Sequence, residues 1–523
     1  MKKYMGKKKG FMRGTSLFLA AALLFSGCGS TGDGGTVDKS GAAQAGEEPS
    51  AAGGAGEDLT VSSSGGLDGA GAMPGTVSAD AVSRPGGDIA GSQSNSTADG
   101  GQVNDTAGGS QSGGGRLSGT AKSSQGEAGA QAESTAVADF GLRLLQVCME
   151  NAEDPFPPYA SVPQNVNEKT EAGRNVLVSP LSVISALAMT AGGAKGETLG
   201  QMEEVFGMSV PELSAFLSDY QAGLPAGESY RLSMANGIWF TDDERFTVEP
   251  DFLQACADSF GAAARKAPFD DSTLKEINQW VEESTDGMIE EILDEIPSDA
   301  VMYLVNALTF DAEWERIYNE YEVREGEFTK ADGTVQQAEM MYSEESQYLE
   351  DEYATGFLKY YADRKYAYAA LLPKEGMSVA EYVATLDGGK LLDILANPMQ
   401  LQVNAAIPKY ENEYGAELSE MLQQMGMPDA FDMGKADFSG IGRSTDGNIF
   451  ISRVLHKTYI AVDERGTKAG ASTAVEMKDE CAMAEDYIRT VCLNRPFLYM
   501  IIDCESNLPV FIGTLEGMEE SGQ

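Results

Sequence analysis

The chain has 523 residues and a formal net charge of −44, with 81 acidic against 37 basic side chains. Phosphate binding needs clustered Lys and Arg, so this charge argues against a nucleic-acid partner. The single histidine, His456, excludes a His-rich metal centre, and a Ser-His-Asp or Cys-His site would need it as the base. Metal-ligand spacings, phosphate-binding glycine loops and nucleophile elbows are also lacking, so we expect no enzymatic activity, metal or cofactor.

The first 27 residues have the pattern of an export signal. A lysine-rich start precedes Leu17–Phe25, an apolar run too short to span a bilayer. Ser26-Gly27-Cys28 follows and resembles a bacterial lipobox, in which the cysteine is acylated. We therefore expect a signal peptide over 1–27, a lipid anchor at Cys28 and an exported, membrane-tethered protein on the bacterial cell surface. An ordinary cleaved signal with an incidental cysteine is the alternative.

The segment 28–134 differs from the rest in composition. Gly, Ser, Ala, Asp and Thr dominate it, and aromatic residues are missing from residue 30 to residue 139. Such a segment cannot bury enough apolar surface to offset the entropy of ordering. We expect a disordered tether that holds a folded domain, residues 135–523, away from the membrane.

The domain 135–523 combines helical and strand patterns. Strands are predicted around 226–240 and 301–310, and helices over 181–191, 277–293 and 417–427. Helices come early and strands gather later, which favours an α+β fold over a regular βαβ alternation. Besides Cys28 there are five cysteines without a CxxC pair, so the sequence predicts a core-stabilised fold rather than a zinc site or a disulfide scaffold: Cys148, Cys256, Cys481, Cys492 and Cys504.

A run of small residues, Gly466–Ala474, follows a strong strand pattern at Tyr459–Val462. In an extended chain, Thr467, Ala469, Ala471 and Thr473 fall on one side, while the charged side chains fall on the other. Gly and Ala hold a strand poorly on their own. We therefore expect a loop that can insert between existing strands; a flexible linker is the alternative.

The ordered motifs of this domain resemble those of the serpin family. NVLVSPLSVISALAMTAGGAKGETLGQM (175–202) is similar to the N-terminal signature, and MANGIWF, LVNALTFDAEW, IPKYENEYGAEL and LNRPFLYMIID follow in family order. The small-residue run resembles the hinge of a reactive-centre loop, here about 464–492. The hinge residues are Gly466, Thr467, Lys468, Ala469, Gly470, Ala471, Ser472 and Thr473.

The resemblance implies a serpin-like fold with three β-sheets, surrounding helices and an exposed loop. It also implies an inhibitor of serine proteases, with cysteine proteases as a second target class. The protease cleaves the loop, remains attached as an acyl-enzyme and is dragged away as the hinge inserts into the large sheet. Four polar residues beneath the opening of the large sheet would act as a latch, namely Ser179, Ser182, Asn306 and His456, and Trp314 completes it as the tryptophan near the top of this opening. The protein is expected to be monomeric.

The cleaved bond follows from a residue count along the loop. In the family the hinge glycine precedes the scissile bond by a nearly fixed length, which gives Glu480–Cys481 here. Counting back from the C-terminal side gives a position near Glu485, so the loop is longer than usual. Glu480–Cys481 is the first choice and Met483–Ala484 the second. A non-inhibitory serpin-fold binding protein is the alternative function.

Overall fold

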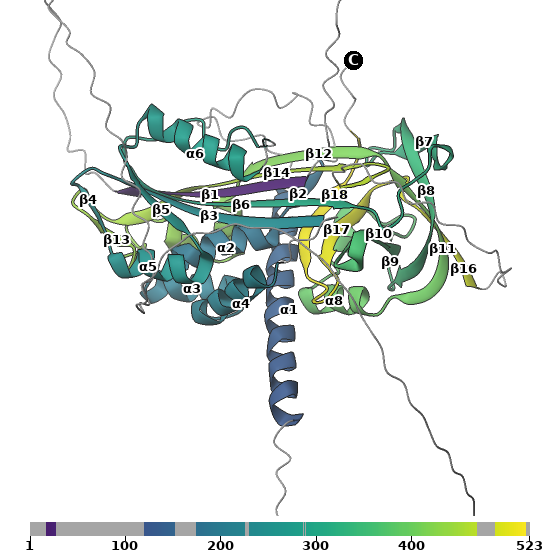
Figure 1. The fold of residues 1–523 in the computed structure, drawn as a ribbon, viewed down its shortest axis with the longest axis horizontal. Helices are drawn as coiled ribbons and strands as arrows, with labels where there is room; N and C mark the ends of the chain where they lie inside the picture. The colour runs from purple at the N-terminus through teal and green to yellow at the C-terminus, as the bar shows by residue number, and fades with distance from the viewer. Residues whose placement is uncertain are drawn as a thin grey trace, which may run out of the picture. The chain divides into compact units, whose positions relative to one another are not determined.

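The computed structural model describes residues 17–27, 120–151, 174–224, 230–285, 287, 289–467 and 487–518. Within these ranges the chain forms helices and three β-sheets in an α+β arrangement, which confirms the predicted fold class (Figure 1). The α-helices are α1 Thr120–Glu150, α2 Pro180–Ala191, α3 Gly196–Phe206, α4 Val210–Ala222, α5 Pro250–Phe260, α6 Asp271–Ser284, α7 Val379–Val383, α8 Gly388–Ala396 and α9 Ser419–Met425. Short 3-10 turns are η1 Glu320–Glu322, η2 Ala362–Arg364 and η3 Pro428–Phe431.

The seven-stranded sheet holds the candidate site. Its strand order is β12-β14-β1-β6-β3-β5, and β15 pairs with the end of β6. The strands are β1 Leu17–Gly27, β3 Tyr230–Thr241, β5 Ala263–Ala267, β6 Ala300–Glu313, β12 Tyr410–Glu417, β14 Ile449–Val462 and β15 Gly466–Thr467. β6 is antiparallel to both β3 and β1, and β1 is also antiparallel to β14.

The second sheet has nine strands in the order β16-β11-β8-β9-β10-β17-β18-β2, with β7 pairing with β8. Its strands are β2 Val176–Val178, β7 Val323–Thr329, β8 Val335–Glu350, β9 Ala354–Tyr360, β10 Tyr366–Pro373, β11 Met399–Pro408, β16 Ile488–Cys492, β17 Phe497–Asp503 and β18 Pro509–Leu515. β10 and β17 are buried along their whole length, as expected for strands covered on both faces. The small third sheet pairs β4 Phe246–Val248 with β13 Gly442–Ser444.

Strand β6 contributes side chains to two separate hydrophobic clusters. Leu304, Leu308 and Phe310 join the main core, which also contains α2. Tyr303 and Val305 point to the opposite face and pack with α6. Figure 1 shows α6 on one face of the sheet and α2 to α5 on the other. Successive side chains of a strand point to opposite faces of the sheet, so neighbouring residues of β6 join different clusters and both faces of this strand are covered.

Most of the predicted elements are confirmed by β3, β6, α2 and α9. The predicted helix over 277–293 is wrong in its second half, because α6 ends at Ser284. Thr285 caps the helix, and Gly287 adopts a left-handed conformation with φ of 82°. Ile289 and Leu293 still pack with the apolar face of α6, so the helical spacing of apolar residues continues without a helix.

Two segments before residue 151 form regular secondary structure. Leu17–Gly27, the apolar part of the expected signal peptide, forms strand β1 between β14 and β6. Helix α1 begins at Thr120, upstream of the expected domain start at 135, because this stretch is rich in Ala, Glu and Gln, which favour helices. None of the described helices combines the length and apolarity that a membrane span requires.

Candidate functional site: the sheet opening and the hinge

The backbone turn that leads into the hinge is held by Asp463. Its Oδ1 accepts hydrogen bonds from the amides of Arg465 at 2.8 Å and Gly466 at 3.2 Å. Gly466 has a φ of 155°, and an added Cβ would lie 2.2 Å from the carbonyl oxygen of Ala312. Glycine is therefore required where the chain turns from β14 into β15.

Three aromatic side chains and one lysine, which we call the hinge-binding cluster, surround this turn: Trp314, Tyr318, Tyr361 and Lys409. The indole Nε1 of Trp314 donates to the carbonyl oxygen of Asp463 at 2.9 Å. The backbone amides of Trp314 and Tyr318 donate to the carbonyl oxygens of Arg465 and Glu464, each at 2.9 Å. The ring of Trp314 stacks on that of Tyr361, with centroids 4.4 Å apart.

The cluster also binds two hinge-proximal side chains. The hydroxyl groups of Tyr361 and Thr467 lie 2.7 Å apart and share a hydrogen bond. Lys409 Nζ lies 2.8 Å from Glu464 Oε2. Partial burial opposes ionisation of Glu464, but Lys409 outweighs it and holds the pKa of this carboxyl below its usual value. These contacts fix the first residues of the hinge against the end of β6.

The hinge is not fully exposed, contrary to the sequence expectation. Gly466 and Thr467 pair with Glu313 and Ala312 of β6, and the Thr467 side chain is 0% exposed. The reason is that the hydroxyl of Tyr361 satisfies the threonine hydroxyl, so burying it leaves no unpaired polar group. The first two hinge residues therefore already form a short strand of the large sheet.

Four buried residues lie around the position between β6 and β14, which β1 occupies, and we call them the polar latch: Ser179, Ser182, Asn306 and His456. They fall into two groups. On one side, Ser182 Oγ donates to Asn306 Oδ1, and Asn306 Nδ2 donates to Asn236 Oδ1 at 2.8 Å. On the other side, the Ser179 amide donates to His456 Nε2 at 3.4 Å. The amide of Ser182 links the groups by donating to Ser179 Oγ at 3.3 Å.

His456 is neutral and incompletely hydrogen-bonded. Burial lowers its pKa from the usual value to about 3. Because Nε2 accepts from Ser179, Nδ1 carries the ring proton, and Nδ1 has no partner among the described residues. Ala21 of β1 pairs with Asn306 of β6 on one side and with His456 of β14 on the other. A strand in this position therefore separates the two halves of the latch.

Trp314, predicted as the part of the latch near the top of the opening, lies in the hinge-binding cluster near the end of β6. Sequence reasoning did not find Tyr361, Lys409 or Asn236. Tyr361, five positions before the buried strand β10, gives no signal by itself, because its partner Thr467 is more than a hundred residues away. The remaining predicted site residues lie outside the described residues: Cys28, Lys468, Ala469, Gly470, Ala471, Ser472, Thr473, Glu480, Cys481, Met483 and Ala484.

Comparisons with known proteins agree with this architecture. A family model described as "Serpin (serine protease inhibitor)" matches residues 161–517. Human Serpin B8 is 32% identical over 355 residues, which cover 65% of this chain and 92% of that protein. An uncharacterized serpin-like protein of Thermococcus kodakarensis is 29% identical and covers 65% of this chain and 80% of its own length.

Two solved structures are also similar to this chain. The native state of the thermophilic serpin tengpin is 43% identical, with a TM-score of 0.65, and the match covers 74% of this chain and 94% of tengpin. Human thyroxine-binding globulin in complex with thyroxine is 21% identical, with a TM-score of 0.63 over 75% of this chain and 100% of that chain. The second similarity supports the fold alone.

Proposed function

Because the chain belongs to the serpin family, we propose that it is a suicide-substrate inhibitor of serine proteases, with cysteine proteases as a second target class. The family comprises protease inhibitors as well as non-inhibitory members, so the choice between them depends on the hinge. The observation that carries the proposal is the pairing of Gly466 and Thr467 with β6. The hinge already has the direction and register from which insertion would continue.

Continuing this register gives the partner of each later hinge residue. Thr467 lies opposite Ala312, so Ala469 would lie opposite Phe310 and Thr473 opposite Asn306. Strand β1 supports this geometry, because Leu17–Phe25 pairs without a register shift along β6 from Phe310 to Met302. The position between β6 and β14 can therefore hold a regular antiparallel strand.

The register also gives Thr473 a chemical role in the inserted state. It would lie between Asn306 and His456 and would share their side of the sheet, since residues directly opposite point to the same face. Its hydroxyl could pair with the free Nδ1–H of His456. Serpin loop insertion is an established example of strand addition. About ten new backbone hydrogen bonds, at roughly 1 kcal/mol each, would release on the order of 10 kcal/mol.

The same count supports Glu480–Cys481 as the reactive bond. Asp479 would lie opposite Ala300, the first residue of β6, so the acyl bond at Glu480 would lie just beyond the inserted strand. A glutamate-specific protease is then the expected target class. Met483–Ala484 is the second choice and would suit elastase- or subtilisin-like enzymes.

Incubation with a panel of proteases of these three specificities tests the proposal. We expect a complex that survives denaturing electrophoresis with the glutamate-specific enzyme, and a released C-terminal peptide that begins at Cys481 by mass spectrometry. A peptide beginning at Ala484 selects the second bond. Digestion by every protease without a stable complex contradicts inhibition and favours the serpin-fold binding protein.

We also propose that the chain is exported and anchored to the bacterial surface through Cys28, and acts as a monomer. The basic start, the apolar run and Ser26-Gly27-Cys28 support this. Removal of 1–27 would vacate the position of β1 and leave it open to the hinge. The variant Cys28→Ala is expected to move from the membrane fraction to the soluble or secreted fraction in cell fractionation. Unchanged, detergent-requiring membrane association would contradict lipid anchoring.

A further inference from the structure

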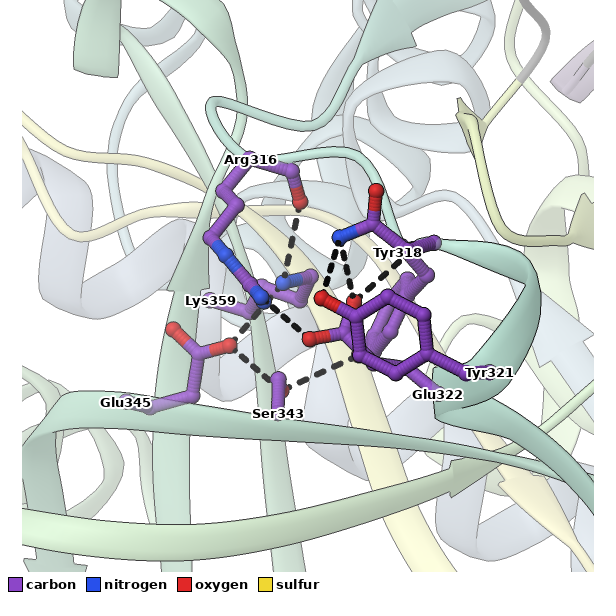
Figure 2. A network of polar contacts seen from close by, with 8 residues as sticks. Arg316, Tyr318, Tyr321, Glu322, Ser343, Glu345 and Lys359 are labelled. Atoms are coloured by element: carbon purple, nitrogen blue, oxygen red, sulfur yellow. Dashed lines mark hydrogen bonds and ion pairs between the residues drawn. The ribbon is translucent and has the colours of Figure 1, made fainter. Parts of the chain in front are cut away.

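An ion pair between a buried lysine and a largely buried glutamate lies behind the hinge-binding cluster. Lys359 of β9 is 2% exposed, and its Nζ lies 2.9 Å from Oε1 of Glu345 in β8 (Figure 2). Burial alone lowers the pKa of a lysine, but Glu345 outweighs burial, and the pKa of Lys359 lies above its ordinary value. The side chain is therefore charged in the folded protein.

The ammonium group of Lys359 faces two rings of the hinge-binding cluster. Its Nζ lies 5.3 Å from the ring centroid of Trp314 and 4.3 Å from that of Tyr318. Both distances fall within the range of cation–π attraction, which is strengthened by exclusion of water. Trp314 and Tyr318 therefore contact both the hinge, through their backbone amides, and the buried cation of Lys359, through their rings.

Further hydrogen bonds fix the pair in place. Ser343 Oγ donates to Glu345 Oε1 at 2.7 Å and lies 3.3 Å from the hydroxyl of Tyr318. Lys359 Nζ also lies 3.5 Å from the backbone oxygen of Arg316, between Trp314 and Tyr318 in sequence. Figure 2 shows these groups converging on one another from β8, β9 and the segment that follows β6.

Fold stability alone does not account for this pair. A buried ion pair is often no more stabilising than apolar side chains of similar volume, because desolvation offsets the attraction. A fixed cation beneath two rings instead restricts the orientation of those rings. The amides of Trp314 and Tyr318 donate to the backbone of Arg465 and Glu464, so this restriction extends to the hinge.

We propose that Lys359 and Glu345 are positioning residues that hold Trp314 and Tyr318 against the hinge and so determine how firmly Gly466–Thr467 rests in the sheet before cleavage. The consequence for inhibition rests on the proposed function, whereas the effect on the hinge itself does not. Loss of the pair would loosen the hinge contacts without unfolding the protein.

The decisive variant is the double replacement Lys359→Met with Glu345→Gln. It removes both charges of the pair, keeps similar side-chain lengths and leaves an acceptor for Ser343. We expect a thermal unfolding midpoint close to that of the parent, and about tenfold faster amide hydrogen exchange at Trp314 and Tyr318, the size expected when the cation–ring attraction is lost. Either single replacement is expected to lower the unfolding midpoint. Lys359→Met leaves the Glu345 carboxylate without its cation, and Glu345→Gln leaves the Lys359 ammonium group without its anion.

Lys390 provides a matched control. Its Nζ lies 3.3 Å from Asp351 and 5.2 Å from the ring centroid of Tyr353, so it also combines an ion pair with a cation–π contact. Lys390→Met should leave exchange at Trp314 and Tyr318 unchanged. The proposal is overturned if the double variant is as stable as the parent and its amides at Trp314 and Tyr318 exchange at the parental rate. It is also overturned if Lys390→Met speeds exchange at these amides as much as the double replacement does. If the double variant does not fold, Lys359→Arg, which keeps the cation, must exchange more slowly than Lys359→Met.

Inhibition gives a second reading. With a protease that the parent traps, the double variant should consume several-fold more inhibitor for each protease molecule inactivated, because a loosened hinge changes the competition between insertion and hydrolysis. An unchanged ratio, together with unchanged exchange, overturns the positioning role. A parent that traps no protease contradicts the proposed function, and the exchange comparison between the double variant and Lys390→Met then still decides this inference.

Discussion

The two ends of the candidate site differ in how completely their polar groups are satisfied. In the hinge-binding cluster, three donors bind the backbone of residues 463–465 at 2.9 Å each, and the Thr467 hydroxyl has a partner at 2.7 Å. In the polar latch, His456 has one acceptor contact at 3.4 Å, and its Nδ1 is buried without a partner among the described residues.

This difference shows where insertion has something to gain. The hinge start is already paired and buried, so little further free energy is available there. An unpaired buried donor costs about 1–3 kcal/mol, which an inserted hydroxyl could recover at the level of the latch. The cluster thus holds the start of the hinge in position, whereas the latch stores part of the driving force.

The largest effect is expected from a charge placed on the inward side just beyond the cluster. Ala469→Arg would bring an unpaired cation opposite Phe310, at a cost of several kcal/mol, so insertion should stop before the protease is trapped. The yield of gel-stable complex should fall by roughly a hundredfold or more while cleavage continues. We choose Ala469 because Thr467 is buried and its replacement by Arg would also disturb folding.

Lys468→Arg is the matched control, since it keeps a cation on the outward side and should leave complex formation unchanged. Trapping by Ala469→Arg at the parental yield would show that the register does not continue from Thr467, and the comparison between the two regions would lose its basis.

The next effect concerns the cluster itself. Trp314→Ala removes a buried ring that stacks on Tyr361 and a donor to Asp463, and we expect a loss of about 3–5 kcal/mol in the free energy of unfolding. Urea denaturation measures it. Trp314→Phe keeps one ring but loses the hydrogen bond and part of the buried indole, so it should cost less than Trp314→Ala, about 1–3 kcal/mol. If Trp314→Ala lowers the free energy of unfolding less than replacement of His456 does, the hinge-binding cluster is not the more stably bonded of the two regions.

The smallest effect is expected at the latch, and its sign changes with pH. The folded pKa of His456, about 3, lies below the unfolded value near 6.5, so the folded state favours the neutral ring. Its contribution to stability is complete above pH 6.5 and is lost as the pH falls towards 3, at about 1.4 kcal/mol per pH unit. His456→Asn should therefore cost roughly 1 kcal/mol at pH 7.5 and become more stable than the parent at pH 4.5.

Denaturation of both proteins at the two pH values tests this crossing. Glu516 acts in the opposite direction, because burial raises its pKa to about 7, so its contribution decreases as the pH rises from about 4.5 to 7. Glu516 is present in both proteins and cancels in their difference. A difference that stays constant between pH 7.5 and 4.5 would contradict a buried, neutral His456.

The sequence predicted the elements with strong periodicity better than the contacts between distant residues. β3, β6 and α2 have regular apolar patterns, so their existence follows from local residues. The burial of β6 on both faces and the burial of Thr467 cannot be predicted from local residues. The first depends on how the sheet is packed and the second on strand register and on a hydrogen bond to Tyr361. The positioning role proposed for Lys359 could not be predicted from the sequence either. A lysine in a strand pattern normally indicates an exposed side chain, and only the fold brings Glu345 close to it.

The strand order of the large sheet also bears on how the chain folds. β12 and β14 come from one stretch of sequence, and β3, β5 and β6 from an earlier one, so each half can assemble from comparatively local segments. Any strand between β14 and β6 joins the two halves through long-range pairing, which forms slowly because loop-closure entropy must be overcome first. During that interval a folding chain presents two unpaired strand edges towards the same gap. The position that receives a strand in the finished molecule is therefore also where a nascent chain is most exposed to pairing with another copy.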